Sequence, residues 1–204
     1  MKRLFLLTLL TLLPLATTAG SFKEQQLEQA IAKAKTRQEK GLAITRMADY
    51  RDLGWVDSEA EMVMTLRNRG GHKSIRHLRV RNMEVTGDGD KALSIFDRPR
   101  DVKGTAVLTW SHALKPDHQW IYLPALKRVK RISSKNKSGP FMGSEFAFED
   151  IGSQEVDKYT HKYLGSQVFN KMSCYVIERK PAYKYSGYKR QVVWLDKKHF
   201  NIQK

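Results

Sequence analysis

Cysteine is nearly absent from this sequence, and the patterns that usually reveal an enzyme are missing too. Cys174 is the only cysteine among 204 residues, so no intrachain disulfide can form, and its apolar neighbours indicate a buried side chain. The six histidines form no HExxH motif, no nucleophile signature surrounds Cys174, and no glycine-rich phosphate loop occurs. The sequence therefore predicts a protein that is not an enzyme, with no catalytic residues and no cofactor.

Two of the histidines could still belong to a metal-binding site. His112 and His118, together with Asp117, could in principle bind a metal ion. Their spacing is generic and matches no established ligand pattern, so we expect no metal at this position.

The N-terminus has the three parts of a secretory signal peptide. Met1-Lys2-Arg3 is followed by an apolar or hydroxylated run from Leu4 to Leu15 and by the small residues that end at Ala19. The run is short for a membrane span, and no cysteine follows the expected cleavage site after Ala19. We therefore expect residues 1–19 to be removed and residues 20–204 to form one soluble, exported domain.

The charge of the chain is strongly one-sided. Its 37 Lys and Arg residues outnumber its 21 Asp and Glu residues, which gives a formal net charge of +16. Such a balance favours anionic partners, namely phospholipid headgroups, acidic protein surfaces or nucleic acid. Export makes nucleic acid the weakest of these, so we expect no nucleic-acid partner.

The clearest helical pattern follows the signal peptide, and only a short central piece of the chain is expected to be helical besides it. Residues 21–40 lack Gly and Pro and place apolar residues three and four apart, which predicts an amphipathic helix ended by Gly41. Residues 43–57 are interpreted as an irregular connector.

Alternating apolar and polar residues then predict about ten strands joined mostly by short turns. The expected strands cover residues 61–67, 74–85, 91–96, 101–112, 119–123, 127–133, 158–169, 173–179, 190–195 and 200–204. Many consecutive strands after a helix indicate a mainly β protein of the α+β class. The expected architecture is a single curved antiparallel sheet that closes as a barrel or wraps around helices. Because the sequence stops in what reads as mid-strand, the final strands of the sheet are expected to be missing.

Three separated blocks of sequence occur in the order found in a known family. They are DVKGT at 101–105, QWIYLPALKRVKRI at 119–132, and GPFMGSEF at 139–146 with Glu149-Asp150 after it. In these blocks the chain resembles the outer-membrane lipoprotein-sorting protein family, which is similar in fold to the periplasmic carriers LolA and LolB. The resemblance runs from about Tyr50 to the end.

This resemblance implies an unclosed antiparallel β-barrel whose apolar concave side is plugged by helices. It also implies a periplasmic shuttle role, often beside inner-membrane transporters of the resistance-nodulation-division (RND) type. The cargo of such proteins is generally unassigned, so lipoprotein carriage is an extrapolation from LolA.

Apolar residues on the expected strand faces are the candidates for the wall of a lipid-binding cavity. Methionines among them suit irregular acyl chains. The alternative is that the same residues form a filled core. The candidates are Met62, Met64, Leu66, Leu78, Val80, Leu108, Trp110, Trp120 and Tyr122.

Six positive charges fall within eleven residues, without an intervening acid, just after Leu126. They are Lys127, Arg128, Lys130, Arg131, Lys135 and Lys137. The first four are the candidate docking residues for lipid phosphates or an acidic partner. The alternative is a solvated edge strand that its charges protect from aggregation.

Aromatic residues on a glycine-rich backbone follow this basic run. Such a cluster suits a mobile lid over a cavity mouth, and it equally suits a fixed plug. The residues concerned are Phe141, Met142, Phe146 and Phe148.

Two functions from different classes remain open. The first is a monomeric, non-enzymatic periplasmic carrier that binds the acyl chains of a lipid or lipoprotein and contacts membrane surfaces transiently. The second is an interaction module that docks on an RND-type transporter and binds no lipid itself. A hydrolase of envelope lipids is a weaker third option, because no nucleophile motif is present.

Overall fold

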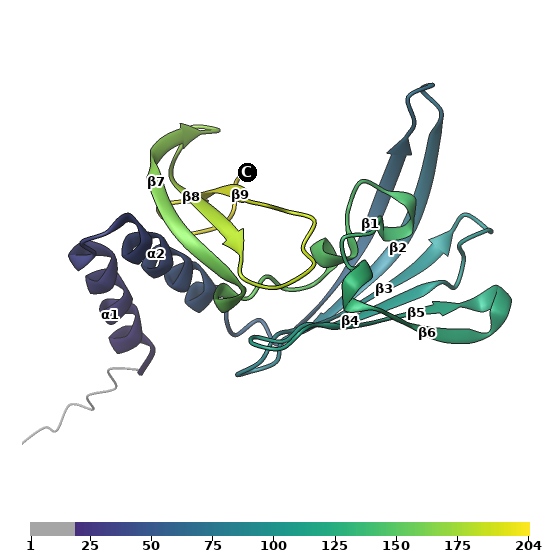
Figure 1. Ribbon diagram of the computed structural model, residues 1–204, viewed down its shortest axis with the longest axis horizontal. Helices are drawn as coiled ribbons and strands as arrows, with labels where there is room; N and C mark the ends of the chain where they lie inside the picture. The colour runs from purple at the N-terminus through teal and green to yellow at the C-terminus, as the bar shows by residue number, and fades with distance from the viewer. Residues whose placement is uncertain (1–18) are drawn as a thin grey trace, which may run out of the picture.

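The computed structural model describes residues 19–204, so the predicted signal peptide lies outside the described residues except for Ala19. Helices α1 (Ala19–Lys33) and α2 (Arg37–Arg51) come first, and nine strands follow within the described range (Figure 1). The strands are β1 (Asp57–Arg67), β2 (Lys73–Met83), β3 (Lys91–Arg98), β4 (Ala106–Trp110), β5 (His118–Leu123), β6 (Arg128–Ile132), β7 (Tyr159–Phe169), β8 (Met172–Pro181) and β9 (Gln191–Asp196). No helix in residues 19–204 is both long enough and apolar enough to cross a membrane.

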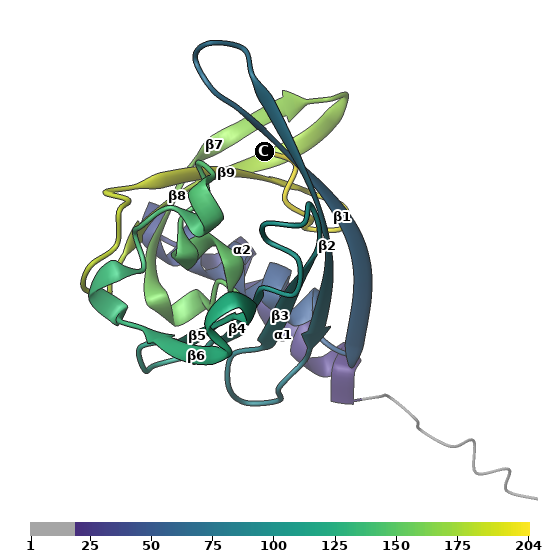
Figure 2. The ribbon, with the colours of Figure 1, turned by 90° about the vertical axis from the view of Figure 1, so that its right-hand side faces the viewer.

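Antiparallel pairing of sequence neighbours builds the whole architecture. Strands β1 to β6 form one six-stranded sheet in chain order, and β7 to β9 form a second sheet of three strands. Seen at right angles, the sheets curve around the segment that joins β6 to β7 (Figure 2). The predicted open antiparallel barrel with helices is confirmed, although its hydrogen bonding divides into two sheets.

The break between the sheets has a local cause. Between β6 and β7 the chain forms short 3-10 turns, η2 (Ser134–Asn136), η3 (Phe141–Gly143), η4 (Phe148–Ile151) and η5 (Val156–Lys158), and these provide no ladder for a neighbouring strand. A further turn, η1 (Pro124–Leu126), joins β5 to β6. The strand expected after residue 200 is reduced to one bridge between Leu195 and Ile202.

The prediction of a single helix over residues 21–40 was wrong, because the chain starts a new helix at Arg37. Thr36 is its N-cap: the Oγ1 atom accepts a hydrogen bond from the Glu39 N–H at 3.1 Å, and Glu39 Oε2 accepts one from the Thr36 N–H at 3.2 Å. This reciprocal pair is a capping box, which satisfies two N–H groups that a helix start leaves open. The Thr-x-x-Glu spacing was present in the sequence.

Gly41 does not end a helix, and the expected connector after it is largely the second half of α2. A Cβ placed on Gly41 would lie 2.8 Å from the Tyr163 backbone nitrogen. The glycine therefore serves close packing of α2 against β7 rather than helix termination.

The buried apolar residues form two clusters. Ile44 and Met47 of α2 pack with Ile177, Leu195 and Phe200, which fixes the helices to the second sheet. The other cluster consists of Leu78, Phe96, Val102, Val107 and Phe141, and it fixes the segment between β6 and β7 to the first sheet. Cys174 is fully buried, as its neighbours predicted.

Candidate functional site

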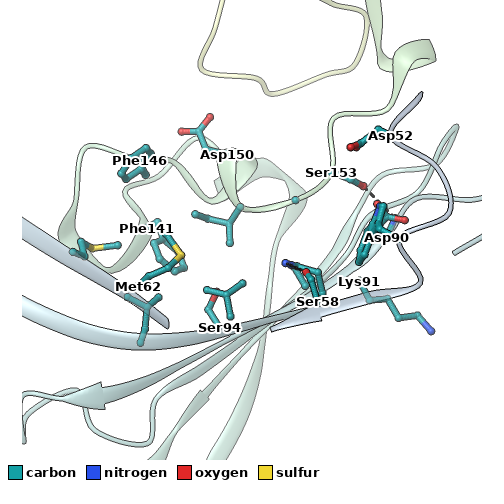
Figure 3. A pocket seen from close by; sticks show the side chains of 18 residues that line it. Asp52, Ser58, Met62, Asp90, Lys91, Ser94, Phe141, Phe146, Asp150 and Ser153 are labelled. Carbon is teal, nitrogen blue, oxygen red and sulfur yellow. Dashed lines mark hydrogen bonds between the residues drawn. The ribbon is translucent and has the colours of Figure 1, made fainter. Parts of the chain in front are cut away.

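A cavity of about 620 Å³ lies between the inner face of β1–β3 and residues 141–153 (Figure 3). Directly paired residues of antiparallel strands share a face, so the pairing of Met62 with Leu78 and of Val80 with Ser94 directs these side chains to one side. On the opposite wall, Phe141 faces Met62 across the cavity (Figure 3).

One end of this cavity is apolar and the other end is polar. The apolar end is built by Met62, Met64, Leu78, Val80, Phe141, Phe146 and Ile151. The polar end holds Asp52, Ser58, Asn82, Asp90 and Ser153, with Trp55 beside them. Two further polar residues, Ser94 and Asp150, lie nearer the apolar end, beside Met62 and Phe146 respectively (Figure 3). A ligand with an apolar chain and a polar head matches this division.

The polar end is acidic, although the protein as a whole is basic. Burial, with the nearby Glu84 carboxylate, raises the pKa of Asp52 and of Asp90 above the usual aspartate value. A second cavity of about 350 Å³ adjoins this end and adds Asp49, Glu155 and Asp157 to its lining. The field there favours hydrogen-bond donors and cationic groups over anions.

Four of the nine predicted lining residues contribute to the cavity, namely Met62, Met64, Leu78 and Val80. Leu66 follows the same alternation along β1 but lies outside the cavity lining.

The placement of the other four, Leu108, Trp110, Trp120 and Tyr122, has to be corrected. In β4, Val107 and Thr109 are the buried residues, and Leu108 is exposed on the outer face. Pairing places Trp120 opposite Leu108, and therefore on that outer face as well. The alternation was recognised, but the inner face was assigned to the wrong set of residues.

Phe141 and Phe146 occupy different environments within the aromatic segment. Phe141 is only 1% exposed, and its ring centroid lies 6.0 Å from that of Phe96 and 5.6 Å from that of Phe148. Phe146 is 57% exposed and stands at the cavity rim. Phe148 and Met142 are partly buried against the same cluster as Phe141.

Hydrogen bonds tie the base of this segment to the sheet. Gln119 Nε2 donates to the Phe148 carbonyl at 2.7 Å, and the Arg76 guanidinium donates to the Met142 carbonyl. The Phe141 N–H donates to the Phe146 carbonyl at 2.6 Å, which closes a tight loop between them. Phe141 and Phe148 are therefore anchored, and Phe146 is the exposed tip.

The four candidate docking residues lie together along one edge of the first sheet. Lys127, Arg128, Lys130 and Arg131 are all exposed on or beside the edge strand β6. None of them forms an ion pair with another residue in 19–204. Their charges therefore face solvent without a counter-charge in the described chain.

The histidines considered as metal ligands make other contacts. His112 Nδ1 lies 2.7 Å from Asp88 Oδ2, and Asp117 forms an ion pair with Lys158. Within residues 19–204, no group of three or more His, Cys, Asp or Glu side chains is placed to hold a metal ion.

A family model described only as an uncharacterized protein matches residues 88–204. A solved structure from Vibrio parahaemolyticus, provisionally described as an outer membrane lipoprotein-sorting protein domain, is 56% identical with a TM-score of 0.79, and the match covers 81% of this chain and 70% of that chain. The chain belongs to the outer-membrane lipoprotein-sorting protein family.

Two further solved structures share this fold. A DUF1329 family protein from Desulfovibrio piger is 33% identical with a TM-score of 0.76, over 82% of this chain and 72% of that chain. A LolA superfamily protein from Nitrosomonas europaea shares the fold at 16% identity and a TM-score of 0.58, over 83% of this chain and 70% of that one. No curated protein matches the chain.

Several residues that line the cavity were missed from sequence. Ser58, Asn82, Ala92 and Ser94 line it because they alternate with outward residues on β1–β3. Their polarity or small size concealed them in a search for apolar positions. Asp52 follows α2, in the region that was interpreted as a connector, and gave no signal.

Proposed function

We propose that this protein is a periplasmic, non-enzymatic carrier that binds acyl chains of a lipid or lipoprotein between β1–β3 and residues 141–153. The observation that carries the proposal is the cavity of about 620 Å³ with one apolar and one polar end. Its volume lies within the roughly 300–1,000 Å³ common for small-molecule sites. Membership of the lipoprotein-sorting family supports the same conclusion.

Burial of methylene groups would supply the affinity. Each buried methylene contributes about 0.8 kcal/mol, so eight of them would contribute roughly 6 kcal/mol before the costs of association. Met62 and Met64 adapt to chains of different shape, because their thioether side chains are unbranched and flexible. The acidic end would receive the polar part of the ligand.

The exposed tip at Phe146 is the part of the segment suited to act as a lid. Phe141 and Phe148 serve as a fixed plug, since their rings pack in the core. Rotation of the Phe146 side chain would cover or uncover the apolar end without disturbing that core.

Binding can be tested with a matched pair of variants. Organic extracts of natively purified protein should contain lipid by mass spectrometry, and a hydrophobic fluorophore should bind in the cavity. The double substitution Met62→Glu and Met64→Glu should reduce both signals at least about tenfold, because charge enters the apolar end. Leu108→Glu on the outer face is the control and should change neither. Absence of both lipid and fluorophore binding in the unsubstituted protein would refute the carrier function.

The exposed basic edge favours a second function, which is docking on an acidic face of an RND-type inner-membrane transporter. Arg128 and Arg131 present charge along an unpaired strand edge with no ion-pair partner in the described residues. Such charge accelerates and orients association with an acidic partner.

Charge reversal distinguishes docking from cargo binding. Substitution of Lys127, Arg128, Lys130 and Arg131 by Glu should abolish capture of the transporter and leave fluorophore binding intact. A variant with the Met62 and Met64 substitutions should lose fluorophore binding and still capture the transporter. If the charge-reversed protein still captures the transporter, this edge is not the docking surface.

A further inference from the structure

A third cavity, of about 360 Å³, lies away from the acyl cavity and is rich in lysine. Residues 113–117 form one wall, Ser134 and Lys137 the second, and residues 182–185 of the β8–β9 loop the third. This loop runs beside the segment between β6 and β7, to which Glu149 ties it by accepting a 2.7 Å hydrogen bond from the Gly187 N–H (Figure 1). Its charged residues are Lys115, Lys137, Lys158, Lys184, Asp117 and Asp157.

Both acids in this lining already have partners. Asp117 forms an ion pair with Lys158, whose side chain is only 10% exposed. Asp157 lies 3.8 Å from Arg46. The remaining three lysines, Lys115, Lys137 and Lys184, form no ion pair and no side-chain hydrogen bond within residues 19–204. The cavity therefore holds an excess of positive charge.

Lys137 is the least solvated of these three. Its Nζ lies 3.4 Å from the centroid of the Tyr183 ring, a cation–π contact that fixes the ammonium at the cavity wall. Burial lowers the pKa of Lys137, and the carboxylates of Glu149 and Asp117 oppose this shift. A desolvated ammonium without a carboxylate partner is stabilised by a bound anion.

Glu149 is prevented from serving as that partner. Its Oε2 accepts hydrogen bonds from the Tyr183 hydroxyl at 2.9 Å and the Ser186 hydroxyl at 2.8 Å, and its Oε1 accepts the Gly187 N–H. These three donors direct the carboxylate toward the β8–β9 loop. They also hold the Tyr183 ring in place under Lys137.

We propose that this lysine cavity binds a phosphate-bearing anion, with Lys137 as the central ligand and Lys115 and Lys184 at the rim. Lysines are point-charge donors suited to phosphate oxygens, and Ser134 adds a hydroxyl. Leu114, Pro116 and Tyr185 supply an apolar wall for an organic substituent on the phosphate. The site is separate from the acyl cavity and does not depend on the proposed carrier function.

Calorimetric titration tests the site with two probes, inorganic phosphate and dihexanoyl phosphatidylglycerol below its micelle concentration. Lys137→Met should weaken binding of whichever probe binds by about tenfold or more, because one charge-assisted contact is lost. Lys184→Ala, at an exposed position, should weaken it about threefold and cannot disturb the core. Lys130→Met on β6 is the control and should leave the affinity unchanged.

The outcomes separate the sources of the anion. Binding of inorganic phosphate that Lys137→Met weakens supports a free phosphate site, and binding of the lipid alone with the same loss supports a headgroup site. The proposal is overturned if neither probe binds to the unsubstituted protein. It is also overturned if the probes bind to Lys137→Met and to Lys184→Ala as tightly as to the unsubstituted protein. Fluorophore binding to the acyl cavity should be the same in all these variants, so failure of one site is distinguishable from failure of the other.

Discussion

Gly41 and Tyr163 approach each other so closely that no side chain fits between them. A Cβ on Gly41 would stand 2.8 Å from the Tyr163 nitrogen and 2.9 Å from the Lys162 carbonyl carbon, both rigid backbone atoms. This contact sets the distance between α2 and β7. It thereby lets Ile44 and Met47 reach the core of the second sheet.

Gly41→Ala should destabilise the protein. Overpacking of this kind costs about 1–3 kcal/mol, which exceeds the gain of up to about 1 kcal/mol that alanine brings to a helix. Urea unfolding followed by circular dichroism measures the difference in the free energy of unfolding. Gly70→Ala, in the β1–β2 turn and with only ordinary contacts to make, is the control and should have little effect. If Gly41→Ala and Gly70→Ala had the same free energy of unfolding, close packing at position 41 would be contradicted.

The two aromatic residues of the proposed plug and tip should respond differently to truncation. Phe141→Ala should lower the free energy of unfolding by about 3–5 kcal/mol, because a fully buried ring leaves a cavity. Phe146→Ala should leave stability nearly unchanged and alter the rates of fluorophore uptake and release. Stopped-flow fluorescence and urea unfolding separate these effects. Unchanged uptake rates in Phe146→Ala would exclude a lid at that position.

Protonation of Asp196 at low pH should lower the free energy of unfolding. Burial by itself would raise its pKa, but hydrogen bonds from the backbone N–H groups of His199, Asn201 and Lys198 and from the Gln203 amide hold the pKa below 3.8. A lowered folded-state pKa contributes stability that is present above pH 3.8 and is lost as the pH falls through the folded-state value.

Asp196→Asn is therefore expected to lower the free energy of unfolding by about 1–3 kcal/mol at pH 7. The difference from the unsubstituted protein should shrink below about pH 3.8. Urea midpoints measured at several pH values check this, and a difference that stays constant down to pH 2 would contradict it.

Glu155 should have the opposite pH dependence. Burial raises its pKa above 4.5, with Asp90 and Asp49 adding to the effect and the Ser153 hydroxyl and Lys158 opposing it. A raised folded-state pKa gives stability that is full below pH 4.5 and is lost as the pH rises through the folded-state value.

Glu155→Gln keeps an acceptor for the Ser153 hydroxyl, which lies 2.6 Å from Oε1, and removes the charge. It should raise the urea midpoint at pH 7 and leave it unchanged near pH 4. Asp157→Asn is the control, because Asp157 is exposed and pairs with Arg46, so no gain is expected. A loss of stability in Glu155→Gln at pH 7 would show that desolvation is not the dominant effect there.

Much of the first sheet could be predicted from local patterns. Alternation located β1, β2 and β3, and Gly70-Gly71 and Gly87 marked the turns between them. Polarity changes likewise separated β5, the basic edge strand and the aromatic segment. These features follow from short-range chemistry, because strand alternation and turn conformations depend on a few neighbouring residues.

The choice of inner face could not be predicted in the same way. In β4 and β5 the outer face is the more apolar one in sequence, with Leu108 opposite Trp120, whereas the inner face places Val107 and Ile121 beside the polar pair Thr109 and Gln119. Which face is inner depends on the segment that packs against the sheet, and this segment brings Phe141 into one buried cluster with Phe96 and Val107. That contact joins positions far apart in the chain.

The basic run also shows where local reasoning stops. Its composition indicated one functional surface, yet the structure leaves Lys127 and Lys130 on the exposed edge and places Lys137 in a separate cavity. The 3-10 turn after β6 and the Tyr183 ring cause this separation. The turn directly precedes Lys137, but Tyr183 lies far from it in the sequence, so local patterns could not reveal this contact.

The sequence by itself determined the class of the protein, the order of its strands, its strong positive charge and its family, because these depend on composition, alternation and contiguous motifs. The tertiary structure decided which apolar face lines the cavity, that Phe141 is anchored while Phe146 is exposed, and that acidic groups gather at one end of the cavity. Those features arise from contacts between segments distant in the chain, and side-chain burial and electrostatic fields exist only once the segments are packed together.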